Sequence, residues 1–202
     1  MATSNKWDCF NVKEKLILTD CDGVLLDWLY SFDQWMKKHG YRVQDESTYS
    51  IKDRYDLGYT DKQRLTRMFN ESAWIRKLPP HLDAIKYVRK LHEEHGYVFH
   101  VITSQTDVEY AQHLRIKNLC EMFGPTVFEK YVILDCGADK DEALLEYRDT
   151  GCWWIEDKPE NADVGAKLGL NSILMAHNHN VNYIGDAVRL GDWKEIYQLI
   201  TG

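Results

Sequence analysis

Two acidic residues, Asp20 and Asp22, lie one residue apart after a short apolar run at residues 16–18. If that run is a buried strand, both side chains lean the same way, because side chains alternate along a strand. They would then emerge at the carboxyl end of the strand, where open α/β sheets bind their ligands. Two neighbouring carboxylates resist joint ionisation unless a cation or a proton lies between them. The pair therefore predicts a site for chemistry that holds Mg²⁺.

Further polar residues follow the later apolar runs of the chain. We expect all of them at strand ends: Thr103, Ser104, Lys140, Glu156, Asp157 and Asn161. In a doubly wound sheet these ends converge on one crevice. A carboxylate nucleophile, hydroxyls, a cation and further acids together favour phosphoryl transfer through an aspartyl-phosphate. Taken separately, Thr103 and Ser104 could simply cap a helix, and Lys140 could be a surface lysine.

The segments that must position these residues alternate between strand-like and helical patterns. Five β-prone runs are expected to be strands: residues 15–19, 97–103, 131–134, 152–155 and 172–176. Four segments with apolar residues at three- and four-residue spacing are expected to be helices: residues 82–95, 108–119, 140–148 and 162–168. This alternation predicts a Rossmann-like α/β fold, in which a parallel sheet with right-handed crossovers is flanked by helices.

The interval from residue 28 to residue 78 breaks the alternation. It is rich in aromatic residues and helical in pattern, and a second helix is expected within it at residues 61–70. Pro79-Pro80 marks the return to the alternating pattern, because proline ends helices and stiffens turns. We therefore predict a small helical cap, residues 28–78, inserted after the first strand of a core domain that comprises residues 1–27 and 79–202.

Composition and charge argue against several classes of protein. The chain has 202 residues and a net charge of −7, whereas binding long nucleic acid requires clustered Lys and Arg. No apolar run approaches the roughly 18–20 residues of a membrane-spanning helix, and the N-terminus lacks a signal-peptide core. The five cysteines, Cys9 among them, are widely spaced and are expected to be reduced thiols. We therefore expect a cytoplasmic protein without a membrane or long nucleic-acid partner.

The ordered motifs resemble those of the haloacid dehalogenase (HAD) superfamily, whose hydrolases carry Asp-x-Asp, then Ser or Thr, then Lys, then an acidic pair. The chain is further similar to the 5′(3′)-deoxyribonucleotidases. That similarity runs along nearly the whole chain, through residues 20–25, 103–104, 139–140, 155–158, 173–174, 177–178 and 192–194. It implies a HAD-like fold and a Mg²⁺-dependent phosphatase that releases phosphate from a (deoxy)nucleoside monophosphate.

The resemblance also implies roles for the polar residues. Asp20 would attack phosphorus, and Asp22 would protonate the leaving alkoxide and then deprotonate the attacking water. Mg²⁺ would be held by Asp20, by the main-chain carbonyl of Asp22 and by Asp157. The phosphate oxygens would be bound by Thr103, Ser104 and Lys140.

Two residues depart from the usual pattern of the family. Glu156 stands where many members have glycine or aspartate, and we expect it to order a water near the metal. Asn161 stands where many members have an acid, and we expect it to hold a carboxylate or a metal-bound water. Whether either residue touches the metal is left open by the sequence.

Aromatic residues of the predicted cap could stack on a nucleobase, an interaction worth about 1–3 kcal/mol. The candidates are Trp28, Phe69 and Trp74, and core packing is the alternative for each of them. His177, after the last predicted strand, is expected to shape the loop beside the site and to contact substrate. A zinc site at His177 and His179 is not expected, because no further ligands lie close to this pair in the sequence.

Other functions are compatible with the sequence. The same chemistry would serve a sugar phosphate or a nucleic-acid 3′-phosphate end, although the acidic charge disfavours the latter. A non-catalytic protein that binds a phosphorylated ligand is the alternative from a different class, but loss of Asp20 or Lys140 would be expected there. The base, the sugar, the 5′ or 3′ preference and the oligomeric state, a homodimer included, are left open.

Overall fold

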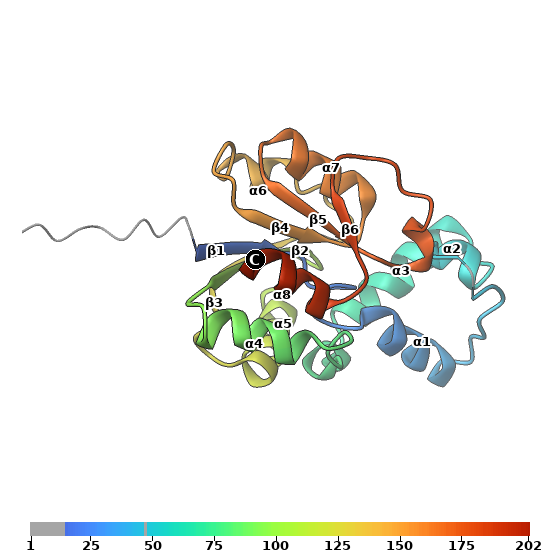
Figure 1. Cartoon of the computed structure of the whole chain (residues 1–202). Helices are drawn as coiled ribbons and strands as arrows, with labels where there is room; N and C mark the ends of the chain where they lie inside the picture. The colour runs from blue at the N-terminus through green and yellow to red at the C-terminus, as the bar shows by residue number, and fades with distance from the viewer. Residues whose placement is uncertain (1–14, 47) are drawn as a thin grey trace, which may run out of the picture.

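The described residues, 15–46 and 48–202 of a computed structural model, form one six-stranded parallel sheet in the order β3-β2-β1-β4-β5-β6 (Figure 1). Its strands are β1 (Leu16–Thr19), β2 (Val98–Ser104), β3 (Phe128–Leu134), β4 (Trp153–Glu156), β5 (Asn171–Met175) and β6 (Val188–Leu190). The predicted Rossmann-like α/β fold is confirmed. The N-terminal segment with Cys9, where no signal-peptide core is expected, lies outside the described residues.

Strand β1 is buried in the middle of the sheet, which explains its uninterrupted apolar sequence. Ile17 pairs with Phe99 of β2 on one side and with Trp153 of β4 on the other. All four residues of β1 are buried, as expected for a parallel strand covered on both faces. The two strands that flank β1 therefore bring their own carboxyl ends beside Asp20.

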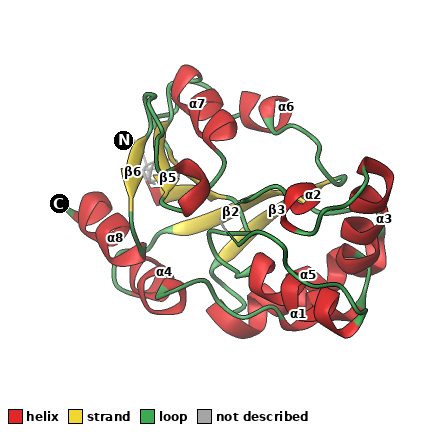
Figure 2. Cartoon of the chain, turned by 90° about the vertical axis from the view of Figure 1, so that its right-hand side faces the viewer, coloured by secondary structure: helices red, strands yellow, loops and turns green. Residues whose placement is uncertain are grey.

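Helices cover both faces of the sheet. The helices are α1 (Trp28–Lys38), α2 (Ile51–Arg54), α3 (Tyr59–Asn70), α4 (Ala84–Glu93), α5 (Glu109–Phe123), α6 (Asp141–Leu145), α7 (Pro159–Lys167) and α8 (Trp193–Thr201), with the 3-10 helices η2 (Ala73–Lys77) and η3 (Asn178–Asn180). In Figures 1 and 2, α6 and α7 lie on one face, and α4, α5 and α8 lie on the other. The sheet is thus the middle layer of three.

The five predicted strands correspond to β1–β5, and the four predicted helices correspond to α4–α7. The helix expected over residues 140–148 is shorter than predicted, because α6 ends at Leu145. The sequence reading missed β6 and α8. Strand β6 has three residues and two of them are exposed, so it has no apolar run by which to recognise it.

Residues 28–78, which we call the inserted segment, contain α1, α2, α3 and η2. The chain enters and leaves this segment at adjacent points, because the Asp27 N–H donates to the Pro79 carbonyl at 2.9 Å. The predicted second helix is α3. The three α-helices lie together at one end of the sheet, on the right in Figure 1. The division into a core domain and a cap stays a prediction.

Helix α1 begins at the end of the loop that carries Asp20 and Asp22. The Asp27 carboxylate accepts a hydrogen bond from the Tyr30 N–H at 3.0 Å, so Asp27 caps the helix. Helix α1 then packs on α3 through aromatic rings, with Phe32 edge-on to Phe69 at 5.3 Å. This packing fixes α1 beside the loop that carries Asp20 and Asp22.

Helix α8 fixes the same loop from the other side. The fully buried Trp193 donates its indole N–H to the Val24 carbonyl at 2.8 Å. Its main-chain N–H donates to the Asp83 carboxylate at 3.0 Å. The end of the chain therefore supports the main chain just after Asp22.

Candidate active site

Asp20 lies at the carboxyl end of β1 in contact with a buried lysine. The Nζ of Lys140 is 2.8 Å from Asp20 Oδ1 and 2.7 Å from Glu156 Oε2, and all three side chains are buried. The Asp20 N–H donates to the Ile155 carbonyl at 2.8 Å, which extends the pairing of β1 with β4. The surface-lysine alternative for Lys140 is therefore wrong.

Burial and the neighbouring charges shift the pKa values of this group of side chains. Burial first, and the Glu156 carboxylate next, raise the pKa of Asp20 to about 6. Burial and the Asp20 carboxylate raise the pKa of Asp157 to about 7. Burial alone would lower the pKa of Lys140, but the Asp20 and Glu156 carboxylates outweigh it and raise that pKa. The carboxylates outnumber the lysine, so the site favours an added cation.

Three carboxylates could hold a metal ion, but one of them is already engaged. Oxygens of Asp20, Glu156 and Asp157 lie within 4.8 Å of one another. Glu156 accepts hydrogen bonds from the Asp157 and Lys158 N–H groups at 2.9 and 3.1 Å. It also accepts from Asn161 Nδ2 at 3.1 Å. Because Glu156 also contacts Lys140, its oxygens are engaged within the protein and it positions the groups around it. Asp20 and Asp157 therefore have the oxygens that suit a metal ion.

A glycine lets the main chain approach Asp157. Gly23 has a φ of +76°, a conformation that L side chains rarely adopt, and a Cβ there would lie 2.4 Å from Asp157 Oδ2. The Gly23 carbonyl accepts a hydrogen bond from His177 Nε2 at 2.7 Å. Only glycine can therefore bring the loop after Asp22 this close to the acidic cluster.

Thr103 and Ser104, at the end of β2, differ in what they can offer a phosphate. The buried Thr103 Oγ1 has no hydrogen-bond partner among the described residues. The Ser104 hydroxyl donates to the Ala138 carbonyl at 2.7 Å, so its proton is engaged within the protein. Thr103 is therefore the better placed of the two predicted phosphate ligands.

Asp22 contacts a residue that the sequence reading missed. The guanidinium of Arg115, on α5, forms a two-pronged ion pair with the Asp22 carboxylate, with Nη2 3.2 Å from Oδ2. It also donates to the sulfur of the buried Cys21 at 2.9 Å. Burial raises the pKa of Asp22, and the Arg115 charge opposes that shift. Arg115 is fully buried. Its position on the apolar face of the predicted helix is the sequence feature that could have indicated a buried, paired arginine.

Of the three aromatic candidates for base stacking, one lines the pocket and two do not. Trp28 lines the pocket beside Asp22. Phe69 is fully buried among aromatic rings, so the expectation that it stacks on a base is corrected: it is a core residue. Trp74 lies outside the pocket lining, and the Lys38 ammonium sits 4.7 Å from its ring. Only Trp28 keeps the predicted access to substrate.

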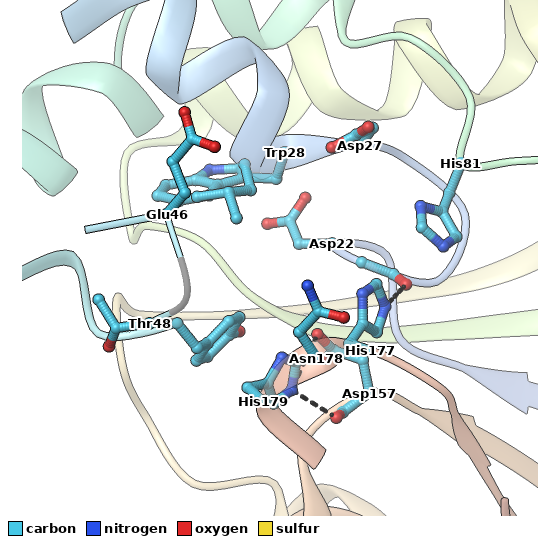
Figure 3. A pocket seen from close by; sticks show the side chains of 13 residues that line it. Asp22, Asp27, Trp28, Glu46, Thr48, His81, Asp157, His177, Asn178 and His179 are labelled. Carbon is cyan, nitrogen blue, oxygen red and sulfur yellow. Dashed lines mark hydrogen bonds and ion pairs between the residues drawn. The ribbon is translucent and has the colours of Figure 1, made fainter. Parts of the chain in front are cut away.

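The pocket itself lies between the loop after β1, the inserted segment and the loop after β5. Figure 3 shows Trp28 and Asp27 on one side, His177, Asn178 and His179 on the other, and Asp22 between them. The sequence reading missed His81, which also lines the pocket. Among the described residues, the group of side chains that could hold a metal ion consists of carboxylates and includes no histidine.

The fold is that of the haloacid dehalogenase-like hydrolases. A protein of that description from Streptococcus pneumoniae matches 93% of this chain and 98% of its own, with a TM-score of 0.64 and 15% identity. CbbY from Rhodobacter sphaeroides, solved in complex with phosphate, matches 90% and 96%, with a TM-score of 0.58 and 18% identity. An L-2-haloacid dehalogenase from Xanthobacter autotrophicus, with chloropropionic acid covalently bound, matches 93% and 98%, with a TM-score of 0.59 and 9% identity.

Sequence comparison adds a relative without an assigned activity. No protein-family model matches the chain. The chain is 25% identical over 190 residues to an uncharacterised 32.4 kDa protein of phage T4, from the Gp30-rIII intergenic region, in a match that covers 89% of this chain and 67% of that protein. In the part of the chain that the structure describes, no helix is both long enough and apolar enough to cross a membrane.

Proposed function

We propose that the chain is a Mg²⁺-dependent phosphomonoesterase that works through an aspartyl-phosphate on Asp20. The observation that carries this proposal is the contact of Asp20 with Lys140 at 2.8 Å beside Asp157, at the carboxyl end of the central strand. A buried carboxylate held next to a cation and further acids is suited to attack phosphorus while the phosphate charge is neutralised. Neighbours of the same fold include a protein solved with phosphate, which supports this chemistry.

The residues present fit a hard divalent cation. Asp20 and Asp157 offer buried oxygens whose raised pKa values reflect burial and crowded negative charge. Oxygen ligands of this kind suit Mg²⁺, and the Asp22 carbonyl would complete the protein's share of the shell. When bound, Mg²⁺ would polarise the phosphoryl oxygens and neutralise their charge.

The chain's own residues divide the reaction between them. A carboxylate oxygen of Asp20 would attack phosphorus, and the bond from phosphorus to the ester oxygen would break. Asp22 would give a proton to the leaving alkoxide and later take one from the water that hydrolyses the aspartyl-phosphate. Lys140 and Thr103 would hold the phosphate oxygens. The Arg115 ion pair supports the second role of Asp22, because it favours the ionised carboxylate that accepts a proton.

We infer further that the substrate is a (deoxy)nucleoside monophosphate. The pocket beside Asp22 has Trp28 on its wall and a Tyr49 ring stacked on His179 at 3.9 Å. Flat rings of this kind suit a nucleobase, whose stacking is worth about 1–3 kcal/mol. The support for a nucleotide comes from the pocket alone, because the residues proposed to bind the phosphate would serve any small phosphate ester.

Phosphate release from an aryl phosphate tests the reaction, and a substrate panel tests the substrate. We expect turnover with Mg²⁺ that EDTA abolishes, and absence of metal-dependent release across pH 5–8 would contradict the enzyme proposal. Nucleoside monophosphates and sugar phosphates are then compared at equal concentration. We expect the nucleotides to be hydrolysed fastest, and a flat profile would contradict the nucleotide assignment while leaving the phosphatase intact.

A further inference from the structure

The pocket has an unusual charge balance. Four carboxylates line it, those of Asp22, Asp27, Glu46 and Asp157. Among the described residues, no lysine or arginine lines the pocket. Asp22 has a role in the proposed reaction and Asp157 in the proposed metal site, whereas Asp27 and Glu46 have no part in either. The cavity holds about 220 Å³.

Three cations that contact the site or the pocket wall are already engaged. Lys140 contacts both Asp20 and Glu156. Arg115 is paired with Asp22. Arg189 lies behind the wall formed by the loop after β5, where its Nη2 donates to the His177 carbonyl at 3.2 Å. A second anion in the pocket would therefore meet carboxylates without a cation of its own.

Two of the three imidazoles on the wall are engaged with the main chain. His177 Nε2 donates to the Gly23 carbonyl at 2.7 Å, and His179 Nε2 donates to the Asp157 carbonyl at 3.0 Å (Figure 3). The Nε2 of each ring is therefore engaged with a main-chain carbonyl. Burial, and His177 next, lower the pKa of His81 to about 4, so that ring is neutral.

One buried atom points to a polar ligand. His81 is 9% exposed, lines the pocket, and its Nε2 has no hydrogen-bond partner among the described residues. A buried polar atom without a partner costs free energy, which a ligand group that forms a hydrogen bond would recover. The pocket therefore combines an excess of carboxylates with a histidine nitrogen that a polar ligand group could satisfy.

We propose that this pocket selects a leaving group that is uncharged or cationic and bears hydroxyl or amino donors, and that it rejects a substrate with a second anionic group. The selection is made by Asp27 and Glu46, which repel a second anion and accept hydrogen bonds from donors. This inference rests on the proposed phosphatase function and adds the charge of the substrate that it accepts.

A pair of small substrates tests the selection without a nucleobase. Phosphoethanolamine and 2-phosphoglycolate are similar in size, but one leaving group is cationic and the other is anionic. We expect kcat/KM to be at least about tenfold higher for phosphoethanolamine. Thymidine 5′-monophosphate and thymidine 3′,5′-bisphosphate repeat the comparison with a nucleoside, and the monophosphate should again be preferred.

The double variant Asp27→Asn/Glu46→Gln removes both charges while Asn keeps the helix cap. We expect it to narrow each preference to about threefold or less, mainly by lowering KM for the anionic member of each pair. The matched control, Glu93→Gln/Asp186→Asn, removes two exposed carboxylates outside the pocket lining and should leave the ratios unchanged.

The outcomes separate this inference from the proposed function. Equal kcat/KM within each pair, or ratios that the double variant does not change, would overturn the charge selection even if nucleotides are hydrolysed. A charge preference without a nucleotide preference would support the selection and contradict the nucleotide assignment. Absence of turnover with every phosphate ester would overturn both.

Discussion

At the scale of single residues, two aspartates one residue apart have different surroundings. Asp20 lies against Lys140 in the acidic cluster, whereas Asp22 is held by Arg115 from α5. Burial raises the pKa of both carboxyls; Lys140 opposes the shift at Asp20, and Arg115 is the main cation that opposes it at Asp22. Surroundings this different support unequal roles for the pair, with Asp20 as nucleophile and Asp22 as acid and base.

Replacing Asp20 by Asn should abolish turnover while the fold is kept. The amide is isosteric with the carboxylate but is a poor nucleophile, so no aspartyl-phosphate can form. Phosphate release and the far-ultraviolet circular dichroism spectrum are the measurements, with Asp186→Asn on the surface as control. Wild-type activity in Asp20→Asn would remove Asp20 from the nucleophilic role.

Gly23→Ala should weaken the metal site. The new methyl group would lie 2.4 Å from Asp157 Oδ2, so the loop or the carboxylate must move. We expect the Mg²⁺ concentration for half-maximal turnover to rise about tenfold or more, because a misplaced metal ligand weakens binding on that scale.

Gly137→Ala is the matched control for this change. Gly137 also has a positive φ, +77°, but a Cβ there would meet nothing within 4 Å. The backbone cost of about 1 kcal/mol should appear in both variants. If the two variants have the same Mg²⁺ dependence, close approach to Asp157 is not the reason for glycine at position 23.

At the scale of elements, Asn70 joins the inserted segment to the loop after β2. Its Oδ1 accepts from the Trp28 indole N–H at 2.8 Å, and its Nδ2 donates to the Gln105 carbonyl at 2.9 Å. Gln105 Nε2 returns a hydrogen bond to the Asn70 carbonyl at 3.0 Å. This link connects α1, α3 and the strand end that carries Thr103.

Asn70→Ala should therefore lower the free energy of unfolding by about 2 kcal/mol, because it leaves buried partners unsatisfied. Arg64→Ala is the control, since the Arg64–Asp61 pair is exposed and such pairs add little to stability. Urea denaturation measures both. A smaller loss for Asn70→Ala than for Arg64→Ala would show that the link adds nothing to stability.

At the scale of the whole molecule, the sheet gathers carboxylates that repel one another. The pKa values of Asp20 and Asp157 rise from 3.8 to about 6 and about 7. Between pH 4 and 7 the folded state therefore binds more protons than the unfolded state at these groups. Their contribution to the free energy of unfolding falls as the pH rises through that window. The buried His81 acts in the opposite sense, because its pKa is lowered.

Mg²⁺ should consequently stabilise the protein more at pH 8 than at pH 5. The ion binds ionised carboxylates, and a ligand that binds only the folded state raises its stability, by about 2.7 kcal/mol at a hundredfold excess over Kd. The measurement is the rise in Tm on adding Mg²⁺ at each of the two pH values. Because each rise compares two samples at the same pH, the contribution of His81 cancels. Asp157→Asn should lose most of this rise, and an equal rise at both pH values would contradict the assignment.

The sequence by itself determined the parallel sheet and the positions that meet at its edge. Uninterrupted apolar runs followed by polar residues are local signals, and strand ends converge whatever the loops do. It did not determine β6, whose short exposed strand has no apolar run, nor the burial of Phe69.

Only the tertiary structure decided which side chains meet. Arg115 is 93 residues from Asp22 along the chain, and the two side chains meet because the fold places α5 beside the loop after β1. His81 reaches the pocket for a similar reason, since its main chain pairs with Leu25. The sequence therefore predicts the chemistry of the phosphate site, which depends on residue type and strand order. The selection of substrate depends on distant segments brought together by packing, and local patterns do not encode those contacts.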